Sequence, residues 1–419
     1  MEKNIGLMIV GTLIFYLLSV LLPQVLIVPT GLSWMVPLLM WRTLGKGAVR
    51  QTSLLLFIGT VAHIFSASHG VFLGWKQILA ANLPLLAMFI GVTFLSLTNK
   101  GFDDPTLPTG NRAIVTTALG IHLLGAAINL SAVLVFGDRL QKKGILSRDQ
   151  ITLLARSFSA AAWWSPFFIA TGVALTYAPG MDWKQTLLPG AVMSFISIGY
   201  SIVEICFFRT TEFSGYPLKA ESLKVPAFLT ATVLSVHHFW HDVNILLLIC
   251  VISPVGAFIF MQGRPRLATL SDFVKNRTMS VISQFALFLS AGVFSTGLKS
   301  ITHVYPELFR LEGLTLSPLL FAIVLAAMVF IGILGVHPIV SIAIVSPLLM
   351  PLNPDQSQLG FLFLSCWAIS TGSSPLSGVG LVFVSRYKAP VREILKGSWH
   401  YAFVMWLIAS VVNVLIFTG

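Results

Sequence analysis

The strongest constraint on the fold is a pair of long apolar stretches that are interrupted by polar, Gly and Pro residues. Residues 334–351 read LGVHPIVSIAIVSPLLMP, and residues 366–385 read CWAISTGSSPLSGVGLVFVS. Each is apolar enough to lie in a bilayer, where backbone groups freed by an interruption must face protein or a water-filled cavity. Broken helices of this kind build the midplane binding sites of secondary transporters. One such stretch alone is equally consistent with a simple kink, because Gly and Pro are common in membrane helices.

Both stretches have a second copy earlier in the chain. Residues 124–140 align with 334–350 at a constant offset, and residues 158–175 align with the second stretch. The match pairs the following polar and glycine positions of the two halves: Gly125 with Gly335, Ser131 with Ser341, and Ser165-Pro166 with Ser374-Pro375. Interrupted apolar segments at corresponding places in two halves are the best sequence indication of a transporter site. We therefore interpret the chain as a duplicated unit.

The composition places the chain among polytopic helical membrane proteins. Of its 419 residues, 56% are hydrophobic and only 10% are charged, and the mean hydropathy is +0.88. This charge content is far below that of a soluble domain. The three cysteines, Cys206, Cys250 and Cys366, all lie in apolar runs, so neither a disulfide nor a zinc framework is expected.

We predict an all-α polytopic fold with about eleven transmembrane helices and two re-entrant hairpins, arranged as two inverted repeats. The uninterrupted spans are expected at residues 5–20, 23–41, 51–68, 76–97, 186–208, 226–240, 243–262, 278–300 and 398–418. Each repeat adds a hairpin and a broken span, at 113–140 and 151–177 in the first and at 316–351 and 358–384 in the second. The domain prediction is an N-terminal span (1–22), a first repeat (23–208) and a second repeat (226–419).

The distribution of basic residues supports one orientation of this topology. Short cytoplasmic loops collect Lys and Arg, and a cytoplasmic N-terminus places nearly all of the 26 Lys and Arg residues inside. The exceptions are Lys76, Lys184, Lys299 and Arg310, which fall outside, and Arg156, which lies in an apolar segment. This predicts a cytoplasmic N-terminus and a C-terminus outside. We expect the membrane to be a bacterial inner (cytoplasmic) membrane. The net charge of +11 is then explained by topology and lipid headgroups, so no nucleic-acid partner is expected.

Two motifs extend the argument to a family. The second hairpin ends in Ser-Pro-Leu-Leu-Met-Pro (346–351), and the next span turns at Ser-Ser-Pro (373–375). They resemble the ion transporter superfamily, whose divalent-anion/sodium symporters carry Ser-Asn-Thr at each hairpin tip, a Pro-x-Leu-Leu-Pro exit and a Thr-Pro-Pro or Ser-Pro-Pro turn. At the second tip this chain has His-Pro-Ile (337–339) instead. That is closer to the Asp-Pro-Thr of the large membrane subunit of tripartite ATP-independent periplasmic transporters. The first half has Ala-Ile-Asn (127–129) at this position.

The resemblance implies an elevator-type carrier that forms a homodimer. Its scaffold would consist of the spans before each hairpin, and its mobile transport domain of the hairpins and broken spans. It also implies coupling to Na+, although the missing Ser-Asn-Thr motif leaves H+ as the alternative coupling ion.

The substrate-site residues that we predict are small and polar, apart from one histidine. They are Asn129, Ser131, Ser165, His337, Ser341, Thr371, Ser373, Ser374 and Ser377. For ion coupling we single out Gly125, Gly335, Ser341, Ser374 and His337, because unwound backbone near the glycines adds carbonyl oxygens to the hydroxyl groups. A simpler explanation for each hydroxyl group taken singly is helix packing.

The chemistry of these residues favours an anionic substrate. A cationic substrate would need a buried carboxylate, and the only acidic residue within a span is Glu204, near its cytoplasmic end. Helix N-termini favour anions. We therefore expect a secondary active transporter of a small organic carboxylate, with export of a toxic oxyanion as the alternative.

His337 is the one titratable residue that we expect at a hairpin tip. It can bind the anion and carry a proton, or simply cap a helix beside Pro338. Arg156 can attract the anion, but we expect it to extend toward the lipid headgroups.

A histidine cluster suggests a function of another class. His237 and His241 are four residues apart, which is zinc-ligand spacing on a helix, and His238 and Asp242 lie beside them. A membrane metalloenzyme is therefore the second hypothesis. The HExxH glutamate is missing, and the position at a span end suits interfacial residues. We expect no enzyme activity and no cofactor beyond the coupling ion, and no phosphate-binding loop for ATP occurs in the sequence.

Overall fold

The computed structural model describes residues 2–98, 107–141, 144–208, 212–216, 220–240, 243–263, 265–309 and 315–417. These residues form helices and no β-strand; their one β-type pairing is an isolated bridge between Thr109 and Ser214. Eight of the described helices are long and apolar enough to cross a membrane. The chain is an all-α polytopic membrane protein, as its composition predicts.

The helices agree with most of the predicted spans. The eight helices that meet the length criterion are Asn4–Leu21, Lys46–Ser68, Trp75–Thr98, Gly110–Ile128, Trp183–Phe208, Ile282–Val304, Gln356–Ser385 and Val391–Phe417. Three of the other predicted spans are shorter apolar helices: Pro23–Leu39, Ala227–Val236 and Ile245–Phe260. The segment Gly110–Ile128, which we expected as one arm of a re-entrant hairpin, is itself long enough to span.

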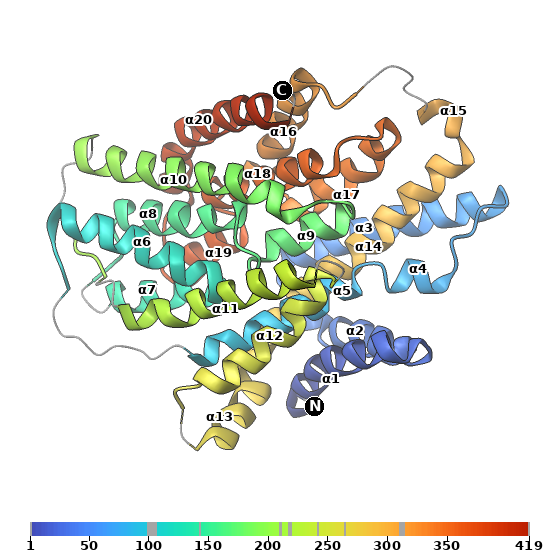
Figure 1. Ribbon diagram of the computed structural model, residues 1–419, viewed down its shortest axis with the longest axis horizontal. Coiled ribbons are helices and arrows are strands. Elements are labelled where there is room, and N and C mark those ends of the chain that lie inside the picture. Colours follow the sequence, from blue (N-terminus) through green and yellow to red (C-terminus); the bar gives the residue numbers. More distant parts are fainter. Residues whose placement is uncertain are drawn as a thin grey trace. The chain divides into compact units, whose positions relative to one another are not determined.

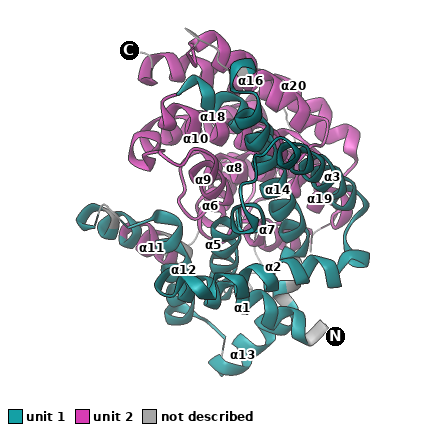
Figure 2. Ribbon diagram, turned by 90° about the vertical axis from the view of Figure 1, so that its right-hand side faces the viewer, with its two compact units in different colours: residues 1–99, 232–314, 342–353 teal, residues 100–231, 315–341, 354–419 magenta. Residues whose placement is uncertain are grey.

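The chain divides into two compact units, each assembled from separate parts of the sequence (Figure 2). Unit 1 comprises residues 1–99, 232–314 and 342–353, and unit 2 comprises 100–231, 315–341 and 354–419. Unit 1 contains the spans that precede each predicted hairpin. Unit 2 contains the first hairpin, part of the second and both broken spans.

Unit 1 is a bundle of helices from both halves of the sequence. Its helices are α1 (Glu2–Leu21), α2 (Ile27–Leu39), α3 (Lys46–Ser68), α4 (Trp75–Leu79), α5 (Leu83–Thr93), α12 (Ile245–Phe260), α13 (Arg266–Asp272), α14 (Ile282–Val304) and α15 (Pro306–Phe309). Both α11 (Ala220–Phe239) and α17 (Pro338–Leu349) contribute residues to both units.

Helices α3 and α14 lie side by side in unit 1 because glycines let their backbones approach (Figure 1). A Cβ atom on Gly59 would lie 2.8 Å from the Cα of Phe294, and one on Gly297 would lie 2.8 Å from the carbonyl oxygen of Gly59. Small residues at the contact are the usual way in which membrane helices pack closely. Ser300 of α14 also donates a hydrogen bond to Ser66 of α3 (2.9 Å).

Unit 2 surrounds the two broken spans. Its helices are α6 (Gly110–Ile128), α7 (Leu130–Gln141), α8 (Arg148–Ser159), α9 (Ile169–Tyr177), α10 (Trp183–Phe208), α16 (Pro318–Ile333), α18 (Gln356–Ser373), α19 (Gly378–Ser385) and α20 (Val391–Phe417). Helix α18 packs against α8, α9, α16 and α20, and its residues Ser357–Ser373 are all buried. The broken spans therefore form the core of this unit.

Both broken spans are interrupted at the same dipeptide. Helix α8 continues into a 3-10 turn that ends at Trp163, and α9 begins four residues after Ser165; α18 ends at Ser373, and α19 begins four residues after Ser374. Each break begins with Ser-Pro. Proline cannot donate a backbone hydrogen bond and disfavours helical geometry at the preceding residue. The local sequence thus explains why both helices stop here.

Helix α7 is fixed to the end of the second broken span. Arg386, just after α19, donates two hydrogen bonds to the Asp138 carboxylate (2.8 and 2.9 Å), and the Tyr387 hydroxyl donates a third (2.8 Å). These hydrogen bonds raise the pKa of the Arg386 guanidinium, so it stays charged. Gly137 leaves the space that the Tyr387 ring occupies.

Candidate functional site

The first hairpin turns at Asn129, which lies between α6 and α7. Its φ is +49° and its ψ is −138°, a conformation that favours Gly and that Asn adopts more readily than other residues. The Asn129 side chain donates a hydrogen bond to the carbonyl of Phe167 (2.8 Å) and accepts one from the backbone N–H of Ile169 (3.3 Å). Asn129 therefore links the hairpin turn to the first residue of α9.

Ser165 makes a second link between the first hairpin and the first break. Its hydroxyl donates to the carbonyl of Ala126 in the last turn of α6 and accepts from the N–H of Phe167 (3.3 Å). The Thr171 hydroxyl in turn donates to the carbonyl of Ser165 (2.6 Å). The break is thus held by side chains that replace the missing helical hydrogen bonds.

The second break is held in the same way. The Ser374 hydroxyl donates to the carbonyl of Ile333 at the end of α16 (3.3 Å) and accepts from the N–H of Leu376 (3.2 Å). Ser165 and Ser374 therefore make equivalent bonds, which agrees with their pairing in the sequence. The two acceptors do not correspond in the hairpin alignment: its constant offset pairs Ala126 with Val336, which is three residues after Ile333.

This shift changes the interpretation of the two hairpin glycines. Gly335 lies at the second turn with a φ of +103°, as expected for a residue that ends a helix. Gly125 lies inside α6, where its carbonyl accepts a hydrogen bond from Asn129 (3.1 Å). Gly125 itself is therefore helical, and the nearest unwound residue is Asn129, four positions later. The missing side chain of Gly125 makes room for the ring of Phe158.

His337 is at the second turn, as predicted, where it caps α17 and packs on the second broken span. Its Nδ1 accepts a hydrogen bond from the N–H of Ile339 (3.3 Å), and its ring meets the Trp367 ring edge to face at a centroid distance of 5.2 Å. Since Nδ1 is an acceptor, the neutral ring carries its proton on Nε2.

Ser377 and Thr371 fix the start of α19. The Ser377 hydroxyl donates to the carbonyls of Thr371 (3.0 Å) and Ser374 (2.8 Å), and it accepts from the N–H of Gly380 (3.1 Å). Ser377 is therefore the N-cap of α19. Its hydroxyl is already used within the protein.

Two predicted site residues carry hydroxyl groups that remain available. Ser341 and Ser373 are 3% and 0% exposed, and neither hydroxyl has a hydrogen-bond partner among the described residues. Ser159, at the end of α8, has a buried hydroxyl in the same situation. A buried polar group without a partner costs about 1–3 kcal/mol, so these groups are candidates to bind a ligand. Ser131 of α7 is only half-buried.

The two broken spans meet at the ends of α8 and α18. A Cβ atom on Gly372 would lie 3.4 Å from the Cβ of Ser159, and Trp163 donates a hydrogen bond from its ring nitrogen to Ser365 (3.1 Å). This contact brings the available hydroxyl of Ser159 to the residue that precedes Ser373. The side-chain hydrogen bonds described above for the two turns, by contrast, join residues of the same half.

Arg156 is deeply buried and does not extend toward the headgroups. Its side chain is 1% exposed and forms an ion pair with Glu204 of α10 at 2.6 Å. It also donates to the carbonyl of Gly397 in α20, and its guanidinium lies 4.4 Å from the centre of the Tyr401 ring. The expectation of an interfacial side chain is therefore wrong, because helices α10 and α20 supply partners for the charge.

The sequence reasoning also missed His122, a buried histidine of the first hairpin. Its Nδ1 donates to the carbonyl of Ser157 (3.1 Å), and its Nε2 accepts from the ring N–H of Trp164 (3.1 Å). This assignment leaves the ring neutral, with both nitrogens used. The sequence did contain one indication of this residue, because a histidine within the apolar segment before Asn129 is unusual.

The histidine cluster of the second hypothesis lies largely outside the described residues. Neither His241 nor Asp242 is described, and the same holds for the side chain of His237. In the part of the chain that the structure describes, no group of three or more His, Cys, Asp or Glu residues could hold a metal ion. The metalloenzyme hypothesis therefore stays a prediction.

Comparisons with known proteins show a similarity to solved structures only at the level of the fold. No family model matches the sequence, and no curated protein matches it. Among solved structures, the Alcanivorax borkumensis YdaH transporter, described as having an unusual topology, is similar over 89% of this chain and 85% of its own. The sequence identity is 12% and the TM-score is 0.40.

Proposed function

We propose that the chain is a secondary active transporter of a small organic anion, coupled to Na+ or H+. The observation that carries this proposal is the equivalent bonding of Ser165 and Ser374, which fixes two broken helices in one unit. Paired broken helices are the usual construction of a transporter site. The helices that begin at the breaks, α9 and α19, direct backbone N–H groups toward them, and such N-termini favour anions.

The side chains of the proposed site support an anion rather than a cation. The site residues include no carboxylate, whereas Ser341 and Ser373 offer buried hydroxyl donors that have no hydrogen-bond partner in the described part of the chain. Hydroxyl and N–H donors can together satisfy the oxygens of a carboxylate. We propose the same set of residues for an exported oxyanion, so the assay must be run in both directions.

Transport by the purified protein tests this function. In proteoliposomes with an imposed Na+ or pH gradient, we expect accumulation or efflux of at least one labelled small carboxylate or inorganic oxyanion. The Ser165→Ala/Ser374→Ala double variant should lose it because both breaks lose their side-chain support. Ser410→Ala is the control, since this serine only bonds within α20. The proposal would be overturned if the solute flux did not depend on either gradient and was the same in the parent protein, the double variant and Ser410→Ala.

The coupling ion can be identified from the two available hydroxyls and His337. We propose Na+, on the basis of the family resemblance. Ser341→Ala and Ser373→Ala should each raise the Na+ concentration for half-maximal transport by about tenfold, because each removes an oxygen ligand without breaking a hydrogen bond to any residue that the structure describes.

His337→Gln is the matched test for the alternative ion. With Na+ coupling, this variant should keep the Na+ dependence of the parent. With H+ coupling, it should bind substrate but lose the response to a pH gradient, because Gln does not titrate. Na+-independent transport by the parent protein would refute our assignment.

Labelling of introduced cysteines tests the proposed orientation. We expect an impermeant thiol reagent to label Lys184→Cys and Asn353→Cys from outside, and Ile145→Cys and Lys396→Cys only after permeabilisation. All four positions are exposed. The background should carry Cys206→Ser, since Cys250 and Cys366 are buried. Outside labelling at Ile145 would contradict the inverted topology.

A further inference from the structure

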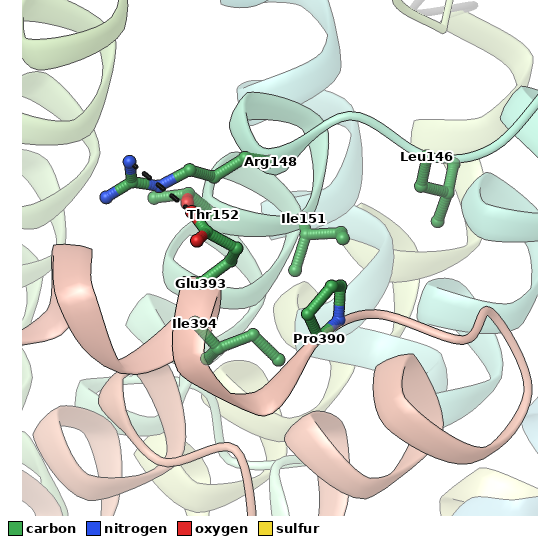
Figure 3. A pocket seen from close by; sticks show the side chains of 7 residues that line it. All are labelled: Leu146, Arg148, Ile151, Thr152, Pro390, Glu393 and Ile394. Atoms are coloured by element: carbon green, nitrogen blue, oxygen red, sulfur yellow. Dashed lines mark ion pairs between the residues drawn. The ribbon is translucent and has the colours of Figure 1, made fainter.

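A small cavity lies where α8 and α20 begin, away from the breaks (Figure 3). Its volume is about 220 Å³, and its lining residues are Leu146, Arg148, Ile151, Thr152, Pro390, Glu393 and Ile394. The charged side chains of Arg148 and Glu393 lie on one side of the cavity, and aliphatic side chains lie on the other (Figure 3). Sites that enclose a whole small molecule usually measure about 300–1,000 Å³. This cavity therefore suits one part of a larger amphipathic molecule.

The charged side of the cavity retains unused binding capacity. Arg148 and Glu393 form an ion pair at 3.7 Å, and both side chains are 39% exposed. That distance is too long for a hydrogen bond. Glu393 also forms an ion pair with Lys396 (3.4 Å). By contrast, Arg386 makes two short hydrogen bonds to the Asp138 carboxylate. The Arg148 guanidinium can therefore turn its donors to another anion at little cost.

The surroundings of the cavity are basic on one side and apolar on the other. Arg392 and Lys396 are exposed on either side of Glu393, the only acidic residue in the sequence of α20. The acidic residue of α8 that follows Arg148, Asp149, is buried. Farther along α20, an exposed apolar stripe runs through Trp399, Phe403 and Leu407. A phosphate can thus bind near Arg148 while a hydrocarbon chain lies along α20. In the predicted orientation both helices begin at the cytoplasmic surface, where acidic lipids attract basic side chains.

We propose that this cavity binds the headgroup of an acidic phospholipid, with Arg148 as the phosphate ligand and Glu393 as its competitor. In the lipid-free state, Glu393 neutralises part of the Arg148 charge. When lipid binds, the phosphate takes the place of Glu393, which keeps Lys396 as its partner. The proposal does not depend on the transported substrate.

Lipid titration of the full-length protein in detergent tests the site, with bound lipids counted by native mass spectrometry. Phosphatidylglycerol should bind more tightly than phosphatidylcholine, and added salt should reduce the difference. Arg148→Gln should weaken phosphatidylglycerol binding by about fivefold, and Glu393→Gln should strengthen it. Lys184→Gln, which removes an exposed charge of α10 on the predicted opposite face, should change nothing.

The opposite effects of the two variants separate a binding site from a structural ion pair. Both substitutions break the same pair, so a purely structural role would change lipid binding equally in both variants. Equal binding of the two lipids would also overturn the proposal. Displacement of the lipid by millimolar inorganic phosphate or glycerol 3-phosphate would assign the cavity to a free phosphate instead.

Discussion

Replacing Arg156 with Met is expected to destabilise unit 2 by about 3–5 kcal/mol, the usual cost of breaking a buried ion pair. The substitution removes the 2.6 Å ion pair of the Glu204 carboxylate, which is 19% exposed, and the hydrogen bond that the carbonyl of Gly397 accepts from Arg156. The effect should fall at the lower end of that range because Glu204 is only partly buried. Thermal or denaturant-induced unfolding in detergent micelles measures it.

Two further variants establish the cause. Arg156→Met combined with Glu204→Leu should recover most of the loss, because an apolar pair replaces both charges. Arg386→Gln, which removes an arginine 53% exposed from its pair with Asp138, should cost less than about 1 kcal/mol. Parent-like stability of Arg156→Met would show that the buried pair contributes nothing, and failure of the double variant to recover would assign the loss to packing.

Asn129→Ala is expected to lower transport by at least about tenfold, the second large effect. Ala loses both bonds that connect the first turn to the start of α9, and it must adopt a positive φ that costs about 1–2 kcal/mol without a side chain to offset it. Initial uptake rates in proteoliposomes, together with the unfolding midpoint, measure the two consequences.

Asn129→Gly separates the backbone from the side chain. Gly adopts the positive φ freely, so this variant should be more stable than Asn129→Ala but should transport equally poorly. Asn353→Gly is the control, since Asn353 also has a positive φ (+47°) but lies in an exposed loop. Full transport by Asn129→Gly would show that only the shape of the turn matters.

The serines at the second hairpin and the second broken span show which part of a site residue type can predict. The sequence predicted Ser341, Ser373, Ser374 and Ser377 as one group of site residues. In the structure, Ser374 and Ser377 hold the second break, and Ser341 and Ser373 have no partner among the described residues. Residue type does not distinguish these roles, because each depends on which carbonyl lies within reach.

By itself, the sequence determined what depends on local chemistry. Its apolar content established an all-α membrane protein, and the two Ser-Pro dipeptides located both breaks, because proline removes a donor wherever it stands. The tertiary structure alone decided what depends on distant partners. It connected Asn129 of the first turn to Phe167 and Ile169 in the first break. It also paired Arg156 with residues 48 and 241 positions away. Such contacts leave no periodic pattern along the chain, since packing selects them only after the helices have formed.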